Sequence, residues 1–183
     1  MSDPARLPRM TADDFIAWAM EQPETGHYEL VAGEVVAMAP ERAAHVRAKQ
    51  RFVRRLEEAI ERAGLPCEAF VDGLAVAVDA HTVFEPDALV RCGATLPDDA
   101  LRIDDPVIVL EILSPATRSV DTGLKFTEYF RLPSLRHYLI VRAETRTVVH
   151  HARTGDGSIA TRLVHDGSLR LDPPGIELAG LFG

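Results

Sequence analysis

The sequence predicts one α/β domain over residues 1–183, in which a mixed sheet is flanked by helices. The order of the elements carries this prediction, because segments with helical spacing of apolar residues alternate with short segments of period two. Composition agrees with it: 46% of the residues are hydrophobic and 26% are charged, as in globular proteins. The chain also contains no internal repeat and no linker that would separate two domains.

The first predicted elements are a helix, a hairpin and a long helix. A capping-box-like start at Thr11 predicts a helix over residues 12–22. Residues 27–40 contain two short strand-like runs joined by an Ala-Gly pair, which is typical of a β-hairpin. The longest helix is predicted over residues 41–64, because apolar side chains recur along one side and Gly64 ends the pattern.

The rest of the chain predicts a sheet that one further helix interrupts. Residues 74–79 alternate with a period of two, and residues 82–92 are strand-like around a proline that indicates an edge or a bulge. Residues 107–113 form a continuous apolar run, which suits a central strand covered on both faces. A helix then begins near Ser119 and stops before Pro133, and the remainder predicts short strands.

Charge and cysteine content narrow the class of protein. The formal net charge of -8 argues against a protein that binds nucleic acid through its overall charge. It does not exclude an enzyme that binds nucleic acid at a local site. Cys67 and Cys92 have no metal-binding or redox spacing, and we interpret both as structural thiols. No apolar stretch reaches the length of a membrane span. We therefore expect a reduced, cytoplasmic protein that is not in a membrane.

One carboxylate, Glu111, lies inside the apolar run of the predicted central strand. An isolated buried carboxylate is costly, so such a group is usually paired, protonated or bound to a cation. Strand alternation places it beside Val109 and Leu113, and Asp87, in the strand that we expect to be the neighbour, follows a proline that can aim it there. Two carboxylates would repel each other unless a cation such as Mg²⁺ or Mn²⁺ lay between them. Alternatively, Asp87 caps a turn and Glu111 pairs with a buried arginine.

A third candidate is Lys125, which follows Glu111 by 14 positions in the next predicted helix. A chain that leaves a strand and folds back as a helix can return this lysine to the carboxylates. There it would orient an attacking water or stabilise the charge of a phosphodiester transition state. The alternative is an ordinary i,i+4 pair between Asp121 and Lys125 on an exposed helix.

The motifs around these residues resemble a known family. The segments "YELVAGEVV", "EPDALV", "VIVLEILSPATRSVDTGLKFTEYF" and "HYLIV", in this order, are similar to the Uma-type family of "putative restriction endonucleases", within the PD-(D/E)xK nuclease superfamily. The resemblance implies a restriction-endonuclease-like core, a divalent metal and phosphodiester hydrolysis. It assigns Asp87 to the "PD" aspartate and Glu111 to the (D/E) position, both as metal ligands.

The sequence departs from the superfamily pattern at one position. Leu113 stands two residues after Glu111, where the superfamily has its lysine. The resemblance implies that the lysine role has moved to the following helix, which indicates Lys125. It also matches Glu29 in "YELV" to an upstream glutamate that would be a third acidic ligand or would hold a water. The alternative for Glu29 is a solvated glutamate on a strand.

Other polar groups have two interpretations each. His45 and Lys49 fall on the inward side of the long helix in its first turns, either because that end faces a polar cleft or, as we prefer, because the helix start is frayed. His150 and His151 lie on a predicted strand, so they point in opposite directions, and we interpret them as structural. The basic residues of the long helix form either a surface for nucleic-acid backbone or a solvated face. They are Arg42, Arg47, Lys49, Arg51, Arg54, Arg55 and Arg62.

Together these features predict a metal-dependent endonuclease that hydrolyses DNA with Mg²⁺ or Mn²⁺. Asp87 and Glu111 would hold the metal, Lys125 would assist catalysis, and Glu29 would be an accessory ligand. The alternative is a dimeric interaction module of the same fold without hydrolytic activity, which Leu113 and the net charge favour. We expect a homodimer in either case, from the fold and from edge strands able to pair.

Overall fold

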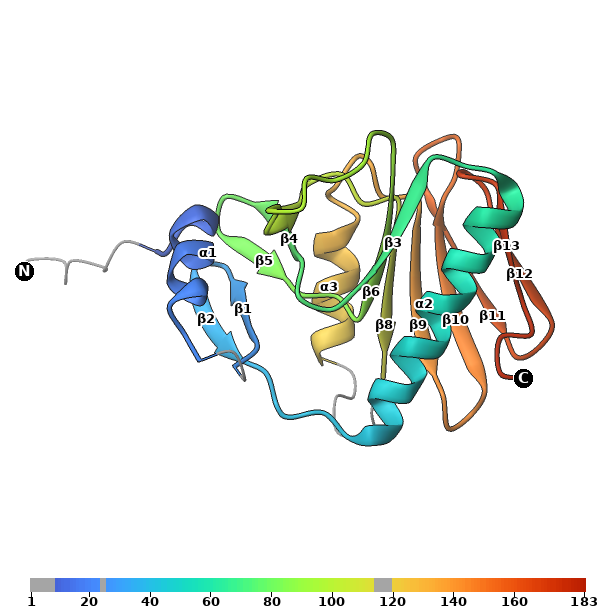
Figure 1. Ribbon diagram of the computed structural model, residues 1–183, viewed down its shortest axis with the longest axis horizontal. Coiled ribbons are helices and arrows are strands. Elements are labelled where there is room, and N and C mark those ends of the chain that lie inside the picture. The colour runs from blue at the N-terminus through green and yellow to red at the C-terminus, as the bar shows by residue number, and fades with distance from the viewer. Residues whose placement is uncertain (1–8, 24–25, 114–119) are drawn as a thin grey trace, which may run out of the picture.

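The computed structural model describes residues 9–23, 26–113 and 120–183, of which residues 120–122 are described by their backbone alone. Within these ranges it contains three helices and thirteen strands, and it confirms the predicted mixed α/β architecture (Figure 1). In chain order the elements are α1 (Ala12–Met20), β1 (Tyr28–Val31), β2 (Glu34–Ala37), α2 (Ala43–Ala63), β3 (Cys67–Val71), β4 (Ala75–Asp79), β5 (Thr82–Phe84), β6 (Ala88–Cys92), β7 (Arg102–Ile103), β8 (Ile108–Ile112), α3 (Val120–Tyr129), β9 (His137–Arg142), β10 (Thr147–Arg153), β11 (Ile159–Val164), β12 (Ser168–Leu171) and β13 (Ile176–Ala179).

Six strands form the larger sheet, in the order β11-β10-β9-β8-β6-β3. β8 and β9 are parallel, and the other neighbours are antiparallel. α2 lies across one face of this sheet (Figure 1), where Phe52 shares a core cluster with Ile108 and Leu110 of β8. On the other face Val109 belongs to a second cluster, which includes Tyr129 of α3. β8 is therefore a central strand covered on both faces, as its apolar sequence predicts.

Five strands form the second sheet, in the order β2-β1-β5-β4-β7, with α1 packed beside it. The prediction of one strand over residues 82–92 is wrong, because β5 belongs to this second sheet while β6 lies inside the larger one. Pro86 stands between them and has no N–H with which to continue a strand ladder. The chain therefore crosses from one sheet to the other at this proline, and Asp87 is the first residue after the crossing.

The ends of the helices largely follow the expected local patterns. At the start of α1 the Thr11 hydroxyl accepts a hydrogen bond from the Asp14 N–H at 3.2 Å. α2 ends at Gly64, whose φ of 62° lies in the left-handed region that favours glycine. α1 and α3 end slightly earlier than predicted, because a turn follows each of them. None of the described helices has the length and apolarity needed to cross a membrane.

The two cysteines are bonded to each other. Cys67 and Cys92 are directly opposite in the antiparallel β3–β6 pair and form a disulfide. The predictions of two separate thiols and of a reduced protein are therefore wrong. They are 25 positions apart without a recognisable spacing, so only the pairing of the two strands brings them together.

The adjacent histidines of β10 have separate surroundings, as alternation along a strand predicts. His150 Nδ1 accepts a hydrogen bond from Arg162 Nε at 2.9 Å, so its proton is on Nε2, which faces His137 Nδ1 at 2.9 Å. His137 then donates from Nε2 to the Pro173 carbonyl oxygen at 2.8 Å. His151 instead contacts a threonine hydroxyl on β11. Burial lowers the pKa of His150 to about 3 and also lowers that of His137, so both rings are neutral near pH 7.

Candidate functional site

Asp87 connects three elements at the junction of the two sheets. One carboxylate oxygen, Oδ2, accepts a hydrogen bond from the Ile112 N–H of β8 at 2.5 Å. The other, Oδ1, lies 3.0 Å from His45 Nε2 of α2. The side chain is buried, and the adjacent Ala88 pairs with Leu110 of β8. The predicted neighbour relation between the Asp87 strand and the Glu111 strand is therefore confirmed.

Glu111 projects from β8 toward α3. Its Oε1 lies 3.2 Å from Lys125 Nζ and accepts a hydrogen bond from the Tyr129 hydroxyl at 3.1 Å. Burial raises the pKa of the Glu111 carboxyl, the Lys125 charge opposes this, and the charges of Asp87 and Glu29 raise it further. The interpretation of a buried arginine as its partner is wrong, because the cation beside it is a lysine. Tyr129 is a further site residue that the sequence reasoning missed.

Lys125 joins Glu111 to Glu29. Lys125 Nζ lies 2.8 Å from Glu29 Oε1, which also accepts a hydrogen bond from the Glu85 N–H at 3.1 Å. Glu29 and Lys125 are only 5% and 3% exposed. The alternatives of a solvated Glu29 on a strand and a Lys125 on an exposed helix are therefore wrong. The side chain of Asp121, the other predicted partner of Lys125, lies outside the described residues.

His45 and Lys49 form the other half of this polar cluster. Lys49 Nζ contacts Glu41, lies 2.7 Å from Asp72 Oδ1 and lies 3.7 Å from Asp87 Oδ1. The hydrogen bond to Asp87 raises the pKa of His45. Burial alone would lower the pKa of Lys49, but hydrogen bonds to Asp72 and Glu41 outweigh it and raise the pKa. The preferred interpretation of a frayed helix start is therefore wrong, because both side chains turn inward to carboxylates.

Glu41 and Asp72 were not predicted as site residues. Glu41 precedes α2 and Asp72 follows β3, so both lie outside regular elements, where periodicity gives no indication of direction. The available sequence indication was the pair His45 and Lys49, two polar residues one turn apart on an otherwise apolar side. Burial raises the pKa of Asp72, although its hydrogen bond with Lys49 opposes the effect.

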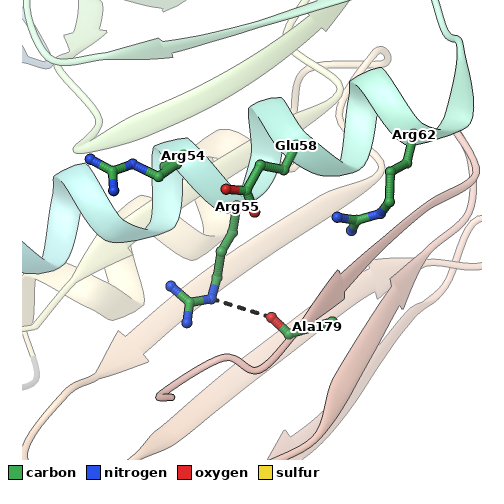
Figure 2. Close-up of a pocket in the computed structure, with 5 residues that line it drawn as sticks. All are labelled: Arg54, Arg55, Glu58, Arg62 and Ala179. Carbon is green, nitrogen blue, oxygen red and sulfur yellow. Dashed lines mark hydrogen bonds between the residues drawn. The ribbon is translucent and has the colours of Figure 1, made fainter.

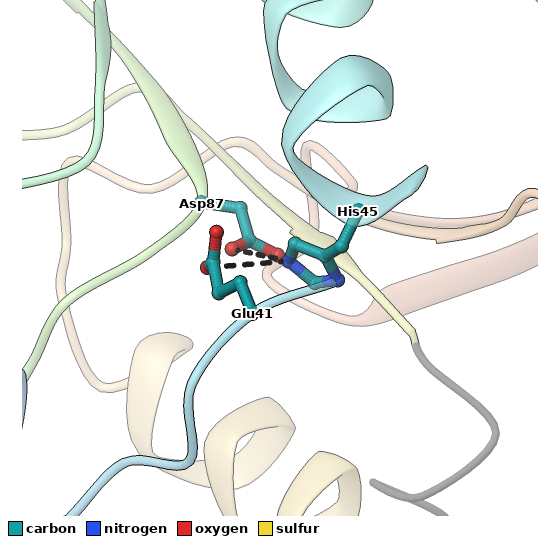
Figure 3. Close-up of side chains that lie close together, drawn as sticks. All are labelled: Glu41, His45 and Asp87. Atoms are coloured by element: carbon teal, nitrogen blue, oxygen red, sulfur yellow. Dashed lines mark hydrogen bonds and ion pairs between the residues drawn. The ribbon is translucent and has the colours of Figure 1, made fainter. Parts of the chain in front are cut away.

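Three of these residues have the donor atoms of a metal site. The ligand atoms of Glu41, His45 and Asp87 all lie within 4.8 Å of one another (Figure 3). The set offers two carboxylate oxygens and one imidazole nitrogen. Carboxylates suit Mg²⁺ and Mn²⁺, whereas an added imidazole suits transition metals better than Mg²⁺. The donor set therefore fits a divalent cation. Glu111 is not among the residues of this group.

A cavity of about 400 Å³ lies between the β1–β2 hairpin and the start of α2. Among the described residues, four carboxylates and a single lysine border it, so a polyanion that entered would need cations beside it. Its apolar wall comes from the segment before α2 and from Tyr28. The residues that line it are Gly26, His27, Tyr28, Ala37, Met38, Ala39, Pro40, Glu41, Lys49, Asp72, Glu85 and Asp87.

Two basic residues in the second half of α2, Arg55 and Arg62, bind the C-terminal part of the chain. Figure 2 shows Arg54, Arg55 and Arg62 projecting from α2, with Arg55 directed toward Ala179. Arg55 Nε donates to the Ala179 carbonyl oxygen at 3.3 Å, and a hydrogen bond from Arg62 reaches the carbonyl of Glu177 at 3.0 Å. Arg55 and Arg62 therefore fasten α2 to β13, which favours a structural role for this half of the basic face.

Comparisons with known proteins agree with this architecture. The family model described as "Putative restriction endonuclease" (Uma2) matches residues 12–180. An uncharacterised protein of Synechocystis sp. is 27% identical over 161 residues, which cover 85% of this chain and 80% of that protein. A crystal structure from Anabaena variabilis, described as a putative nuclease belonging to DUF820, superposes with a TM-score of 0.72 at 16% identity, over 94% of this chain and 97% of that one. Because the family model spans most of the sequence, the chain belongs to the Uma2 family of putative restriction endonucleases.

Proposed function

We propose that this protein is a metal-dependent endonuclease, formed by one domain over residues 1–183, that hydrolyses DNA phosphodiester bonds with Mg²⁺ or Mn²⁺. The observation that carries the proposal is the group of ligand atoms on Glu41, His45 and Asp87, which lie within 4.8 Å of one another next to the strand of Glu111. Glu111 lies on β8, and Asp87, immediately before the neighbouring strand β6, accepts a hydrogen bond from the main chain at Ile112, the residue after Glu111. Family membership supports a nucleic acid as the substrate.

Each residue of the cluster has a role in this proposal. Asp87, with Glu41 and His45 beside it, would hold the cation, and Glu111 would complete the site from β8. The cation would supply Lewis-acid stabilisation of the charge that develops on the phosphate. Lys125 occupies the helix to which the resemblance moves the lysine role, and its contacts with Glu111 and Glu29 support a part in this site.

The rival function is an interaction module of nuclease fold without hydrolytic activity. It is favoured by the way Lys49 and Lys125 already neutralise the carboxylates. In both cases we propose a homodimer in the cytoplasm. The edge strand β2 supports pairing between copies, because Val35 and Val36 on it are 38% and 46% exposed.

A plasmid-nicking assay tests the proposal. Wild type should nick supercoiled DNA in Mn²⁺ or Mg²⁺ but not in EDTA, and Asp87→Asn and Glu111→Gln should each lower the rate at least about 100-fold. Asparagine keeps an acceptor for the Ile112 N–H, so the Asp87 variant should still fold. Asp166→Asn is the matched control, because the Asp166 side chain is 68% exposed and pairs only loosely with Arg146. Nicking that survives both site substitutions would reject the assignment.

Metal titration separates the two functions. Calorimetry with Mn²⁺ should show binding to wild type and weaker binding to Asp87→Asn. Absence of Mn²⁺ binding by wild type would leave the interaction module as the better account.

A further inference from the structure

Two buried lysines approach the carboxylates from opposite sides. Lys125, from α3, is held between Glu29 and Glu111, and its Nζ lies 5.4 Å from the centre of the Phe84 ring. Lys49, from α2, contacts Glu41, Asp72 and Asp87. Both side chains are almost fully buried, so each is committed to the site rather than to solvent.

The two lysines differ in what lies next to them. Lys49 borders the cavity of about 400 Å³ between the hairpin and α2, together with Glu41, Asp72 and Asp87. Lys125 and Glu111 are not among the described residues that line this cavity. A phosphate that enters it therefore meets the Lys49 ammonium first, and a single point charge of this kind is a common phosphate partner.

Lys49 also shares its partners with the candidate metal ligands. Glu41 Oε1 is the atom that contacts both Lys49 Nζ and, at 3.6 Å, His45 Nε2. Asp87 Oδ1 lies 3.0 Å from His45 Nε2 and 3.7 Å from Lys49 Nζ. One oxygen cannot serve an ammonium and a divalent cation equally well at such distances, because the two positive charges repel. When Glu41 and Asp87 turn to a divalent cation, Lys49 loses two of its three partners and keeps Asp72.

We propose that Lys49 is a second catalytic lysine, which contacts the scissile phosphate in this cavity and becomes available when Glu41 and Asp87 bind a divalent cation. Asp72, whose Oδ1 lies 2.7 Å from Lys49 Nζ, borders the same cavity and would keep the ammonium beside it. Lys125 then acts as a positioning residue that fixes Glu111 and Glu29. The inference rests on the proposed function, since it names the residue of that site which meets the substrate.

The test combines metal binding, DNA binding and cleavage for Lys49→Met, Lys49→Gln, Lys49→Arg and Lys125→Met. Removing the competing charge at Lys49 should tighten Mn²⁺ binding in calorimetry by at least about fivefold. Lys125→Met should produce a smaller gain, because the ion pairs of Lys125 are with Glu29 and Glu111 rather than with Glu41 and Asp87. With Ca²⁺ in place of Mn²⁺, fluorescence anisotropy should show that Lys49→Met weakens binding of a short DNA duplex at least about fivefold, and that Lys49→Arg restores part of it. Nicking should fall at least about 100-fold in Lys49→Met.

The outcomes distinguish this inference from the proposed function. Lys49→Gln replaces Lys49→Met if the methionine variant fails to fold, as judged by circular dichroism. Unchanged or weaker Mn²⁺ binding in the neutral Lys49 variants would overturn the inference, even if wild type cuts DNA. If wild type does not cut DNA, the proposed function fails. In that case the Mn²⁺ and DNA affinities of the Lys49 variants still test whether Lys49 contacts the phosphate. Affinities equal to those of wild type would overturn the inference.

Discussion

Acid should destabilise this protein through the buried His137–His150 pair. In the folded chain His150 accepts from Arg162 and donates to His137, which requires a neutral ring. Burial lowers the pKa of His150 to about 3, against 6.5 for an ordinary histidine. Between about pH 3 and pH 6.5, His150 is therefore protonated in the unfolded chain but neutral in the folded chain. The free energy of unfolding therefore falls as the pH falls from about 6.5 toward 3.

The size of this effect follows from the change in the pKa of His150. Each pKa unit corresponds to about 1.4 kcal/mol, so the full difference gives an upper bound of roughly 5 kcal/mol, reached below about pH 3. At pH 5 only part of it applies, about 2 kcal/mol relative to pH 8. Solvent reaches the exposed Arg162 beside the pair and screens some of the interaction, so we expect about 1 to 2 kcal/mol between pH 8 and 5.

Urea unfolding at pH 8, 6.5 and 5 measures this loss by circular dichroism. Glu111, whose pKa is raised, changes stability in the opposite direction, so the decisive quantity is the difference between wild type and His150→Gln at each pH. Glutamine can still donate to His137 but does not titrate. The variant should be less stable than wild type at pH 8 and should lose less stability on acidification. His165→Gln, at an exposed histidine, is the control. A wild-type-to-variant difference that is the same at pH 8 and pH 5 would refute the assignment of a neutral pair.

Three other predictions concern the buried charges and the cysteines. Glu111→Gln should lower the nicking rate at least about 100-fold yet stabilise the metal-free protein in EDTA, most clearly above pH 7. The raised pKa means that the wild-type carboxyl contributes stability at low pH that is lost as the pH rises, and a flat difference across pH would contradict this. Lys125→Met should lower the free energy of unfolding in urea by about 3 to 5 kcal/mol, because Glu29 and Glu111 lose their shared cation. The double variant Lys125→Met with Glu111→Gln should recover part of this loss. Thiol titration of the unreduced, denatured protein should find no free Cys67 or Cys92, and Cys67→Ser should cost roughly 3 kcal/mol; two titratable thiols would contradict the bond.

The main elements and half of the residues of the candidate site could be predicted because local patterns determine them. The apolar run of β8 requires burial on both faces, and a carboxylate inside such a run must have a partner, which identifies Glu111. Asp87 follows from the proline before it, since a proline that interrupts a strand re-aims the next side chain. Lys125 could be predicted because α3 follows β8 directly and folds back over the same face.

The rest of the site depends on contacts between segments distant in the sequence. Asp72 follows β3, and the packing of α2 against the larger sheet brings it to Lys49, 23 positions before it in the sequence. Glu41 is only eight positions before Lys49, but it lies in the irregular segment before α2, where periodicity gives no indication of direction. The division of residues 82–92 between two sheets depends on which partners β5 and β6 find, and a sequence pattern of period two does not choose between partners. The Cys67–Cys92 bond likewise follows from the register of β3 on β6.

The energetics of the buried charges bear on the choice between enzyme and interaction module. Glu29, Glu111 and Lys125 are each at most 9% exposed, and an ion group buried this far is often no more stable than apolar residues of the same volume. Leu113, on the same side of the strand as Glu111, packs against the core cluster there, so that side accommodates an apolar residue. A module that only needs to fold and dimerise therefore gains little from three charges in this place. A site that must hold a cation and a phosphate needs such charges, with their partners already positioned. The cost of burying Glu111 is thus an argument for catalysis.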